Sequence, residues 1–403
     1  MTPSRLRTLH VIPSVALSDG GPSRAIGLME EALAAAGVNM EVATTDYDGP
    51  GRRLPGPFDD QGLLARGAVP PVRRHFPLLT HFYKTSPALA RWLWRHVTDY
   101  DVVHIHALFS FSSLMAAWAA RWHGVPYVVR PLGTLTHYGV TQRRPFIKRL
   151  SLRWLEGPIL QHAAAVHFTA AAEQDEAMRL GLPLRPVVIP LAVATLPPPD
   201  TDGLLARFPA LATPGYLLFL SRLDPKKNLE SLLKALVRLT LAHPTLHLAV
   251  AGDGDPAYVT QLQALAQTLG VAERVTWTGF VDAGLKSAVL SRASVFVLPS
   301  FSENFGIAAA EALSAGLPCV LGQGVAIAEA VQAAGAGVSV APTPEAVAAA
   351  VAPYLNDPAA RAQASTLAGA FARDHFSTSA LGHNLLKLYA TLKPPSGIRR
   401  SFQ

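Results

Sequence analysis

Short apolar runs alternate with longer amphipathic runs through the first half of the chain. The longer runs predict helices over residues 22–36, 87–97, 110–123, 145–161 and 171–180. The short runs are rich in Val and Ile, as buried strands are; they read TLHVIP, NMEVATT, DVVHIHA, PYVVRP, AVHFTA and PVVIPLA. Alternation of this kind is typical of a parallel sheet covered by helices.

The alternation stops at LPPPDTDG, residues 196–203, and then restarts. Its prolines and glycine predict a linker. Strands are expected after it at YLLFLS, HLAVAG, RVTWTG, SVFVLPS and PCVLG. The clearest helix begins NLESLLKALVRL, with Asn228 as its N-terminal cap and an apolar stripe of Leu229, Leu232, Leu233, Leu236 and Val237. The sequence therefore predicts two consecutive α/β domains, residues 1–195 and 203–375, with a ligand site at the carboxyl ends of their strands, in a cleft between the two.

Residues 48–85 do not follow this pattern. They mix Pro, Gly and Arg with little periodicity, which predicts a long loop or an irregular insertion. A role facing an acceptor or a membrane is one interpretation, and a purely structural loop is the other.

Composition narrows the class of protein. Half of the 403 residues are hydrophobic and 16% are charged, which indicates a folded globular protein. The single cysteine, Cys319, lies in the apolar GLPCVLG, so we expect it to be a buried thiol in a reducing compartment. The chain shows neither a signal peptide nor about 18 consecutive apolar residues, so a cytoplasmic location is expected.

The net charge of +7 is concentrated in one part of the sequence. Between Val102 and Leu155 there is no acidic residue, and the basic ones are Arg121, Arg130, Arg143, Arg144, Lys148, Arg149 and Arg153. Such a surface could meet anionic lipid, an anionic substrate or nucleic acid, or it could simply be solvated. The segment QRRPFIKRLSLRWLEGPIL lies here and predicts a basic amphipathic helix, which either lies on an anionic membrane or packs on the sheet.

Candidate chemistry lies at the ends of the predicted strands of the second half. Arg222 and Lys227 follow YLLFLS and precede a helix, a position that suits a diphosphate, although a solvated turn is the alternative. AGDGD follows the next strand. Gly279 and Phe280, in WTGFV, follow another and could offer backbone groups to a base, or form a structural turn.

Gly20 and Gly21 join the first strand to a helix. They permit a close approach of the backbone to an anion at the start of that helix. The glycines do not have the G-x-G-x-x-G spacing of dinucleotide sites, so an NAD or FAD site is disfavoured.

The stretch SENFGIAAAEALSAGLP carries two glutamates eight positions apart, Glu303 and Glu311. Gly306 is the expected start of a helix whose amides can hold phosphate, with Glu303 before it and Glu311 inside it. Eight residues rise about 12 Å along a helix, whereas the paired carboxyls of glycosidases lie about 5 to 9.5 Å apart. A hydrolytic pair is thus disfavoured, and separate roles on one ligand fit better, with a structural helix glutamate as the alternative for Glu311.

Taken together, these motifs resemble the retaining nucleotide-sugar glycosyltransferases of family 4, which have the two-domain GT-B fold. SENFGIAAAEALSAGLP, SRLDPKKN, AGDGD, TGFV and GGPSR carry the resemblance over nearly the whole chain. It implies a C-terminal helix in residues 376–403 that returns to the N-terminal domain.

The resemblance also implies roles for single residues. Arg222 and Lys227 would neutralise the donor diphosphate without a divalent metal, and Glu303 would hold the hydroxyls of the transferred sugar. Glu311 would bind the ribose. The backbone of the donor loop, Asn304, Phe305 and Gly306, would contact sugar and phosphate, and Gly20 and Gly21 would close over the donor. Transfer would proceed by front-face attack of the acceptor hydroxyl, with no enzymic nucleophile.

The N-terminal domain departs from the family pattern at two places. Leu132 stands where many relatives have a histidine, and LAVA follows VVIP where an asparagine and a glycine are usual. Sugar or acceptor contacts are therefore open among four candidates, which are Arg24, His106, Arg130 and His137; for both histidines a structural role is the alternative.

The sequence thus predicts a transferase acting from a UDP- or GDP-sugar on a lipid-linked or cell-surface polysaccharide acceptor. It predicts no metal, no cofactor and no nucleic-acid partner. Peripheral contact with an anionic membrane through the basic N-terminal domain is a further hypothesis. The alternative from another class is a non-catalytic nucleotide-sugar-binding subunit of a polysaccharide assembly complex; a phosphorylase would need a pyridoxal-binding lysine, which the motifs do not identify.

Overall fold

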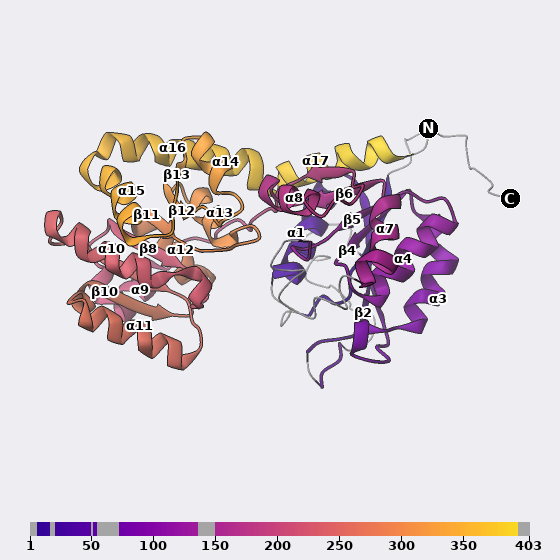
Figure 1. Cartoon of the computed structure of the whole chain (residues 1–403), viewed down its shortest axis with the longest axis horizontal. Coiled ribbons are helices and arrows are strands. Elements are labelled where there is room, and N and C mark those ends of the chain that lie inside the picture. Colours follow the sequence, from indigo (N-terminus) through magenta and orange to yellow (C-terminus); the bar gives the residue numbers. More distant parts are fainter. Residues whose placement is uncertain (1–5, 17–20, 50, 55–71, 136–149, 394–403) are drawn as a thin grey trace. The chain divides into compact units, whose positions relative to one another are not determined.

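The computed structural model describes residues 6–16, 21–49, 51–54, 72–135 and 150–393 (Figure 1). Two compact units can be separated by their internal contacts. Unit 1 comprises Met1–Ala192 and Thr378–Gln403, and unit 2 comprises Val193–Ser377. Each unit is described by itself below.

Within the described residues, the sheet of unit 1 has seven strands in the order β3-β2-β1-β4-β5-β6-β7, all parallel. The strands are β1 Arg7–Val11, β2 Asn39–Thr45, β3 Val72–Phe76, β4 Val102–His106, β5 Tyr127–Arg130, β6 Ala165–Phe168 and β7 Pro186–Val188. The order reverses between β1 and β4, which is where open α/β sheets bind their ligands.

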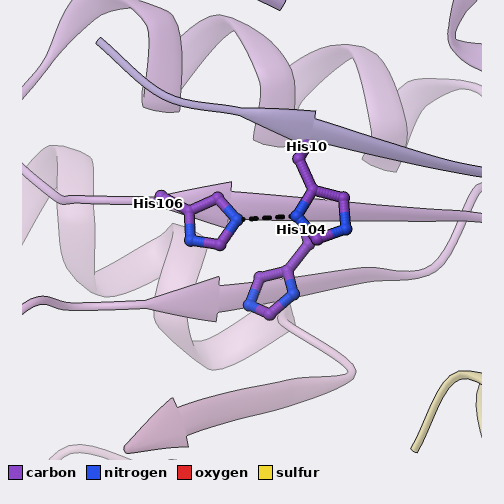
Figure 2. A group of neighbouring side chains, drawn as sticks. All are labelled: His10, His104 and His106. Atoms are coloured by element: carbon purple, nitrogen blue, oxygen red, sulfur yellow. Dashed lines mark hydrogen bonds between the residues drawn. The ribbon is translucent and has the colours of Figure 1, made fainter. Parts of the chain in front are cut away.

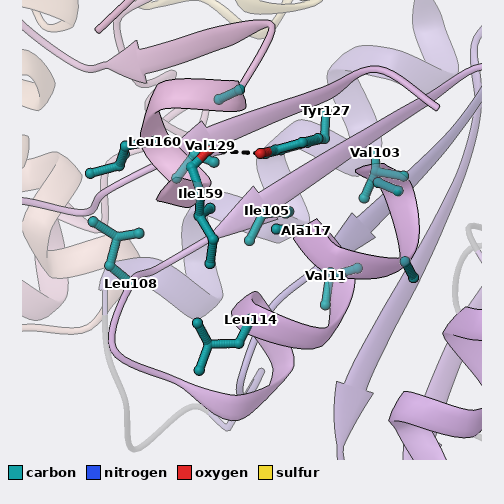
Figure 3. Close-up of a cluster of buried hydrophobic side chains, with 14 of the residues drawn as sticks. Val11, Val103, Ile105, Leu108, Leu114, Ala117, Tyr127, Val129, Ile159 and Leu160 are labelled. Atoms are coloured by element: carbon teal, nitrogen blue, oxygen red, sulfur yellow. Dashed lines mark hydrogen bonds between the residues drawn. The ribbon is translucent and has the colours of Figure 1, made fainter. Parts of the chain in front are cut away.

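Helices cover both faces of this sheet. They are α1 Gly21–Ala35, α3 Pro87–His96, α4 Phe111–Trp122, a π-helix at Leu152–Glu156, α7 Gly157–His162, α8 Ala171–Met178 and α17 Thr378–Leu392. On one face, Ile105 and Val129 pack against Leu114 and Ile159, and Tyr127 donates a hydrogen bond to the Ile159 carbonyl at 2.7 Å (Figure 3).

The other face of the sheet lies under α1 and α17. Ile26 and Met29 of α1 and Leu385 of α17 form a second core with Val42, Val102 and Val128 of the sheet. The two helices approach closely, since a Cβ at Gly382 would lie 2.5 Å from the Ala32 carbonyl oxygen. Helix α17, the last one in the described residues, is therefore part of the core of unit 1.

One strand falls in the segment that was expected to be irregular. Val72–Phe76 forms β3, the edge strand next to β2, so the interpretation of residues 48–85 as loop throughout was wrong. Its sequence, VRRHF, is too polar to predict a strand. In the folded chain the two arginines form ion pairs, Arg73 with Glu30 and Arg74 with Glu41. Residues 50 and 55–71 lie outside the described part of the chain.

Unit 2 contains, in its described residues, a parallel sheet of six strands in the order β10-β9-β8-β11-β12-β13. The strands are β8 Tyr216–Leu220, β9 Leu248–Ala251, β10 Val275–Gly279, β11 Ala293–Leu298, β12 Cys319–Gly322 and β13 Gly337–Val340. The order reverses between β8 and β11. Cys319 is fully buried, as expected, and burial raises the pKa of its thiol.

The helices of unit 2 are α9 Thr201–Arg207, α10 Leu229–Ala242, α11 Pro256–Thr268, α12 Ala283–Arg292, α13 Ile307–Ser314, α14 Ala328–Ala333, α15 Pro344–Asn356 and α16 Pro358–Phe376. Residues 201–203, predicted as linker, begin α9, because the Asp200 side chain caps it by accepting from Gly203 N at 3.0 Å. Among the described helices of both units, every one is too short or too polar to cross a bilayer.

Asn228 occupies the predicted N-cap position of α10, but its side chain does not cap the helix backbone. Its backbone is left-handed, with φ 56°, and its side chain makes no cap hydrogen bond to α10. Instead Nδ2 donates to the carbonyls of Pro299 at 3.1 Å and Pro342 at 2.8 Å. Asn228 therefore ties the start of α10 to the end of β11.

Candidate functional site

The turn after β8 presents two cations at the point where the strand order of unit 2 reverses. Arg222 is exposed, whereas Lys227, in a 3₁₀ turn at Pro225–Lys227, is buried. The turn is fixed by Asp224, whose side chain accepts from Lys226 N at 3.1 Å, and by Phe301 N, which donates to the Lys226 carbonyl at 2.8 Å. The end of β11 thus holds Lys227 in place.

Lys227 and Glu303 form an ion pair across this point. Nζ of Lys227 donates to Oε1 of Glu303, and the side chains are only 7% and 20% exposed, so water screens the pair weakly. Burial lowers the pKa of Lys227, while the Glu303 carboxylate opposes the shift; Lys226 and Arg222 lower it further. The result is a partly desolvated lysine in a cluster of positive charge.

The loop after β12 positions Glu303. The backbone N of Glu303 donates to Gly324 O at 2.8 Å, and the Glu303 carbonyl accepts from Ala326 N at 3.1 Å. The carboxyl ends of β8, β11 and β12 are therefore joined through main-chain bonds around the Lys227–Glu303 pair.

The AGDGD loop after β9 packs directly on the strand exit that carries Arg222. Leu223 N donates to Asp253 O at 2.8 Å. Gly252 has φ 136°, and a Cβ there would lie 1.9 Å from the Ser221 carbonyl oxygen, so only glycine fits.

Gly279 and Phe280 lie at the end of β10, next to the same loop. The Gly279 carbonyl accepts from Gly252 N at 2.8 Å, and the Phe280 side chain is 72% exposed. An exposed aromatic ring at a strand end is available to a planar ligand.

The donor loop Asn304–Gly306 has mixed exposure. Asn304 is exposed, whereas the Phe305 ring is buried and meets the Phe376 ring edge-on at 5.5 Å between centroids, so only its backbone can contact a ligand. Gly306 precedes α13 with φ 95°, and a Cβ there would lie 2.9 Å from Val325 Cγ1.

Glu311 lies in the second turn of α13, where it pairs with a partner that the sequence did not suggest. Lys286 of α12 donates to its Oε1 at 2.5 Å. The side chains of Lys286 and Glu311 are 22% and 14% exposed. Glu311 is therefore neither an isolated carboxylate nor paired with Glu303.

The candidates of unit 1 are divided by burial. Gly20 and His137 lie outside the described residues. Gly21 and Arg24 are exposed on the first turns of α1. His106 and Arg130 end β4 and β5, are register partners, and are 0% and 2% exposed. Arg130 therefore does not belong to a solvated basic surface as expected; Arg121 and Arg153 are exposed, and the other four basic residues of that group lie outside the described part.

His106 belongs to a cluster that no motif revealed. His10 of β1 and His104 of β4 lie beside it, and Figure 2 shows the His10 and His106 rings joined by a hydrogen bond of 2.9 Å. One nitrogen from each of the three rings lies within 4.8 Å of the others, close enough to share a metal ion. Burial lowers the pKa of all three, to about 3 for His10, and the positive charge of Arg130 lowers each further.

A weak sequence signal for the cluster exists. In VVHIH the two histidines are two positions apart, so they share one face of a buried strand. His167 also interrupts an otherwise apolar strand, and His10 lies between Leu9 and Val11 of β1.

Comparisons with known proteins agree on one family. The model for the glycosyl transferase 4-like domain matches residues 20–192, and that for glycosyl transferases group 1 matches residues 206–368. The glycogen synthase of Mycobacterium tuberculosis is 31% identical over 276 residues, which are 64% of this chain and 61% of that protein. The chain thus spans less than two thirds of that relative.

Other relatives align over more of their length. The GDP-mannose:cellobiosyl-diphosphopolyprenol alpha-mannosyltransferase of Komagataeibacter xylinus is 27% identical over 342 residues, 84% of this chain and 80% of that protein. Among solved structures, sucrose-phosphate synthase from Thermosynechococcus elongatus covers 96% of this chain and 99% of its own, with TM-score 0.72 and 21% identity. Anabaena HepE in complex with UDP and glucose covers 96% and 100%, with TM-score 0.71 and 18% identity. These structures share the fold.

Proposed function

The chain belongs to the glycosyl transferases group 1, with the two Rossmann-like domains of the GT-B fold, and we propose that it is a retaining glycosyltransferase. It moves a sugar from a UDP- or GDP-sugar to a lipid-linked or cell-surface polysaccharide acceptor. The observation that carries this proposal is the largely buried Lys227 paired with the partly buried Glu303 at the order reversal of unit 2, beside the exposed Arg222. HepE, which shares the fold, was solved with UDP and glucose.

Arg222 and Lys227 bind the donor diphosphate. Arginine can contact phosphate oxygens through two N–H groups, and Lys227 supplies a partly desolvated point charge. Both stabilise the negative charge that develops on the leaving diphosphate, an electrostatic contribution of the kind that is usually the largest in catalysis.

Glu303 binds hydroxyls of the transferred sugar, and Glu311 binds the ribose. In the reaction, the acceptor oxygen forms a bond to the anomeric carbon on the face from which the diphosphate departs. The bond from that carbon to the phosphate oxygen breaks, and the proton of the acceptor passes to the leaving diphosphate. Because attack and departure take place on the same face of the sugar, the anomeric configuration is retained, and no covalent glycosyl-enzyme is needed.

A panel of nucleotide sugars tests the donor. We expect one UDP- or GDP-sugar to raise the unfolding temperature, because a ligand that binds only the folded chain stabilises it by mass action. Transfer of the same sugar to a lipid-linked acceptor, with retained configuration by NMR, then distinguishes an enzyme from a binding subunit. Stabilisation without transfer to any acceptor would indicate the binding subunit, and no stabilisation would exclude both.

We expect transfer to be unaffected by excess EDTA. Arg222 and Lys227 supply the positive charge that a divalent ion supplies elsewhere, so no metal is needed at the diphosphate. Initial rates in EDTA and in MgCl₂ would be compared at saturating donor. A rate restored only by Mg²⁺ or Mn²⁺ would refute the assignment of charge neutralisation to these two side chains.

Membrane contact through unit 1 is also part of this proposal. Trp94 of α3 and Trp122 of α4 are 46% and 71% exposed, with ring centroids 5.7 Å apart. Trp118 and Trp154 are also exposed, and exposed arginines lie within three positions of these tryptophans, namely Arg91, Arg95, Arg121 and Arg153. Exposed tryptophan with cationic neighbours suits the interface of an anionic bilayer.

We therefore expect the chain to sediment with phosphatidylglycerol vesicles more than with phosphatidylcholine vesicles, and less so as salt increases. Trp94→Ser with Trp122→Ser should reduce this binding. Leu241→Ser is the control, since Leu241 is 84% exposed on α10 of unit 2. If the double tryptophan variant and the Leu241→Ser control both sedimented as much as the unaltered chain, this surface would not be the membrane contact.

A further inference from the structure

A chain of hydrogen bonds runs through the face of the unit 1 sheet that α1 and α17 cover. It joins four histidines of three strands, His10, His104, His106 and His167, to Tyr389 of α17, and all five residues are 0% exposed. From one end, the contacts are His167 Nε2 to Ile189 O at 2.8 Å, His167 Nδ1 to His104 Nε2 at 3.3 Å, His104 Nδ1 to Tyr389 Oη at 2.7 Å, Tyr389 Oη to His10 Nε2 at 3.3 Å, and His10 Nδ1 to His106 Nε2 at 2.9 Å.

The Ile189 carbonyl fixes the direction of the first links. A carbonyl only accepts, so His167 must carry its proton on Nε2. Its Nδ1 is then an acceptor, since burial and Arg130 keep the pKa of His167 at about 3 and the ring neutral. His104 must therefore donate from Nε2 and accept at Nδ1, and the hydroxyl proton of Tyr389 points to His104.

The remaining links follow from the single proton of Tyr389. Because that proton is given to His104, the phenol oxygen accepts from Nε2 of His10. The Nδ1 of His10 then accepts from Nε2 of His106. His106 is left with an unprotonated Nδ1, and this atom is buried and lacks a hydrogen-bond partner in the described structure.

The surroundings of His106 suggest what this lone pair is for. Arg130, its register partner on β5, has an Nε–H that is also buried without a partner in the described structure. The lone pair of His106 Nδ1 and the Nε–H of Arg130 are an acceptor and a donor, the two kinds of partner that a hydroxyl group needs. The loop that follows His106 is strained, with Ala107 at φ 84° and Phe109 at φ 55°, as occurs at functional sites.

A shared metal ion fits these rings less well. Every ring nitrogen of His10 and His104 already has a hydrogen-bond partner, so a metal would have to displace those bonds. The guanidinium of Arg130, close enough to lower the pKa of all three histidines, also repels a cation.

We propose that Tyr389 is a positioning residue, which through His10 holds His106 in the Nε2–H tautomer so that Nδ1 accepts a hydrogen bond from a hydroxyl of a sugar ligand. The nature of that ligand rests on the proposed function. The tautomers follow from the contacts and from the neutrality of the buried rings, and they do not depend on the ligand.

The tautomers are tested by NMR of the full chain labelled with ¹⁵N-histidine, without ligand, near pH 7.5. We expect four neutral rings, all protonated at Nε2. A charged His106, or a proton on its Nδ1, would overturn the proposal. Stoichiometric binding of added Zn²⁺, with loss of the Nε2–H signals, would likewise overturn it in favour of a metal centre.

The ligand is tested by adding UDP-glucose or GDP-mannose, with UDP and GDP as controls. We expect the sugar nucleotide that binds, by calorimetry, to shift the His106 Nδ1 resonance, and the nucleotide alone to leave it in place. If the nucleotide sugar binds without this shift, no sugar hydroxyl donates to His106 Nδ1. That result would overturn the role proposed for His106 but leave the transferase proposal intact. Failure of every nucleotide sugar in the thermal panel would instead refute the transferase proposal.

The role of Tyr389 is tested by Tyr389→Phe against Tyr127→Phe. Each variant removes one buried hydroxyl from the same unit, and Tyr127 lies on the opposite face of the sheet (Figure 3). For transfer, we expect Tyr389→Phe to lower kcat/KM about tenfold, the value of one hydrogen bond, and to release the His10 and His106 tautomers in the NMR spectrum. Tyr127→Phe should change neither. Parallel losses in both variants, or unaltered tautomers in Tyr389→Phe, would overturn the proposal.

Discussion

Replacing Lys227 by alanine is expected to lower kcat for sugar transfer about a hundredfold to a thousandfold, the usual cost of removing one preorganised group that stabilises developing charge. The substitution acts twice. It removes a cation from the diphosphate, and it leaves the Glu303 carboxylate, 20% exposed, without its ion-pair partner. Arg222→Ala and Glu303→Gln are expected to abolish measurable transfer for related reasons.

Lys226 provides the matched control. It is the preceding residue, carries the same charge and is exposed. Its contribution to the turn comes from its backbone, which accepts from Phe301 N. Lys226→Ala should therefore retain transfer within a few fold. Similar losses in Lys226→Ala and Lys227→Ala, with folding checked by circular dichroism, would show that net charge and not the position of Lys227 matters.

Glu303→Gln is also expected to change the pH dependence of donor binding. The carboxylate opposes the burial that lowers the pKa of Lys227, so its removal should lower that pKa further. Donor binding that depends on charged Lys227 should then be lost at a lower pH in the variant. Calorimetric titration of the donor across alkaline pH would measure this, and an unmoved profile would separate Lys227 from donor binding.

The second large effect is a steep loss of stability in mild acid. The pKa values of His10 and His167 are lowered to about 3, and those of His104 and His106 lie well below 6.5. In the unfolded chain these rings take up protons below about pH 6.5. The unfolded state then binds more protons, so the free energy of unfolding falls as pH falls.

Glu156 acts in the opposite direction. Burial raises its pKa from 4.5 to about 7, so the folded chain carries one more proton than the unfolded chain between those values. The histidine protons outnumber the one on Glu156, and His75 and His247, whose pKa values burial also lowers, act in the same direction. Each excess proton of the unfolded chain contributes about 1.4 kcal/mol per pH unit. Since whole domains are stable by about 5 to 15 kcal/mol, this slope removes a large share of the stability over one to two pH units, so we expect a steep loss below about pH 6.

Urea unfolding between pH 7.5 and 5 measures the slope directly. His167→Gln should reduce the proton uptake by one, provided that the variant folds at pH 7.5. If it does not, Glu156→Gln serves instead, because removing the opposing group should steepen the slope by one proton. A free energy of unfolding that is flat from pH 7 to 5 would contradict the neutral, buried state of the four rings.

The parts of the structure that follow from the sequence are those set by local pattern. Apolar runs are buried in almost any α/β sheet, so both sheets could be predicted from them. VRRHF could not, because β3 is an edge strand whose arginines find Glu30 and Glu41 only after folding. Asn228 follows the rule for a cap in sequence, but its left-handed backbone sends the side chain to Pro299 and Pro342.

The histidine cluster shows the same limit at the candidate site. Each ring taken singly fits a structural role, and His106 stayed open between that role and a ligand contact. The strand order of the sheet places β4 beside β1 and brings the rings together, and α17 adds Tyr389 from 379 residues away from His10. Neither the strand order of the sheet nor the packing of α17 on unit 1 can be predicted from a local sequence pattern. Lys286 and Glu311, 25 residues apart on two helices, escaped prediction for the same reason.

The place of α17 in the core of unit 1 has a consequence for synthesis on the ribosome. Residues 1–192 emerge first, but Ile26, Met29 and the buried histidines lack their cover until Thr378–Leu392 has left the exit tunnel. Unit 2 emerges in the interval and contains its own sheet and core. The half of the protein that is translated first is therefore the half that completes folding last, and one apolar face of its sheet stays partly uncovered until then.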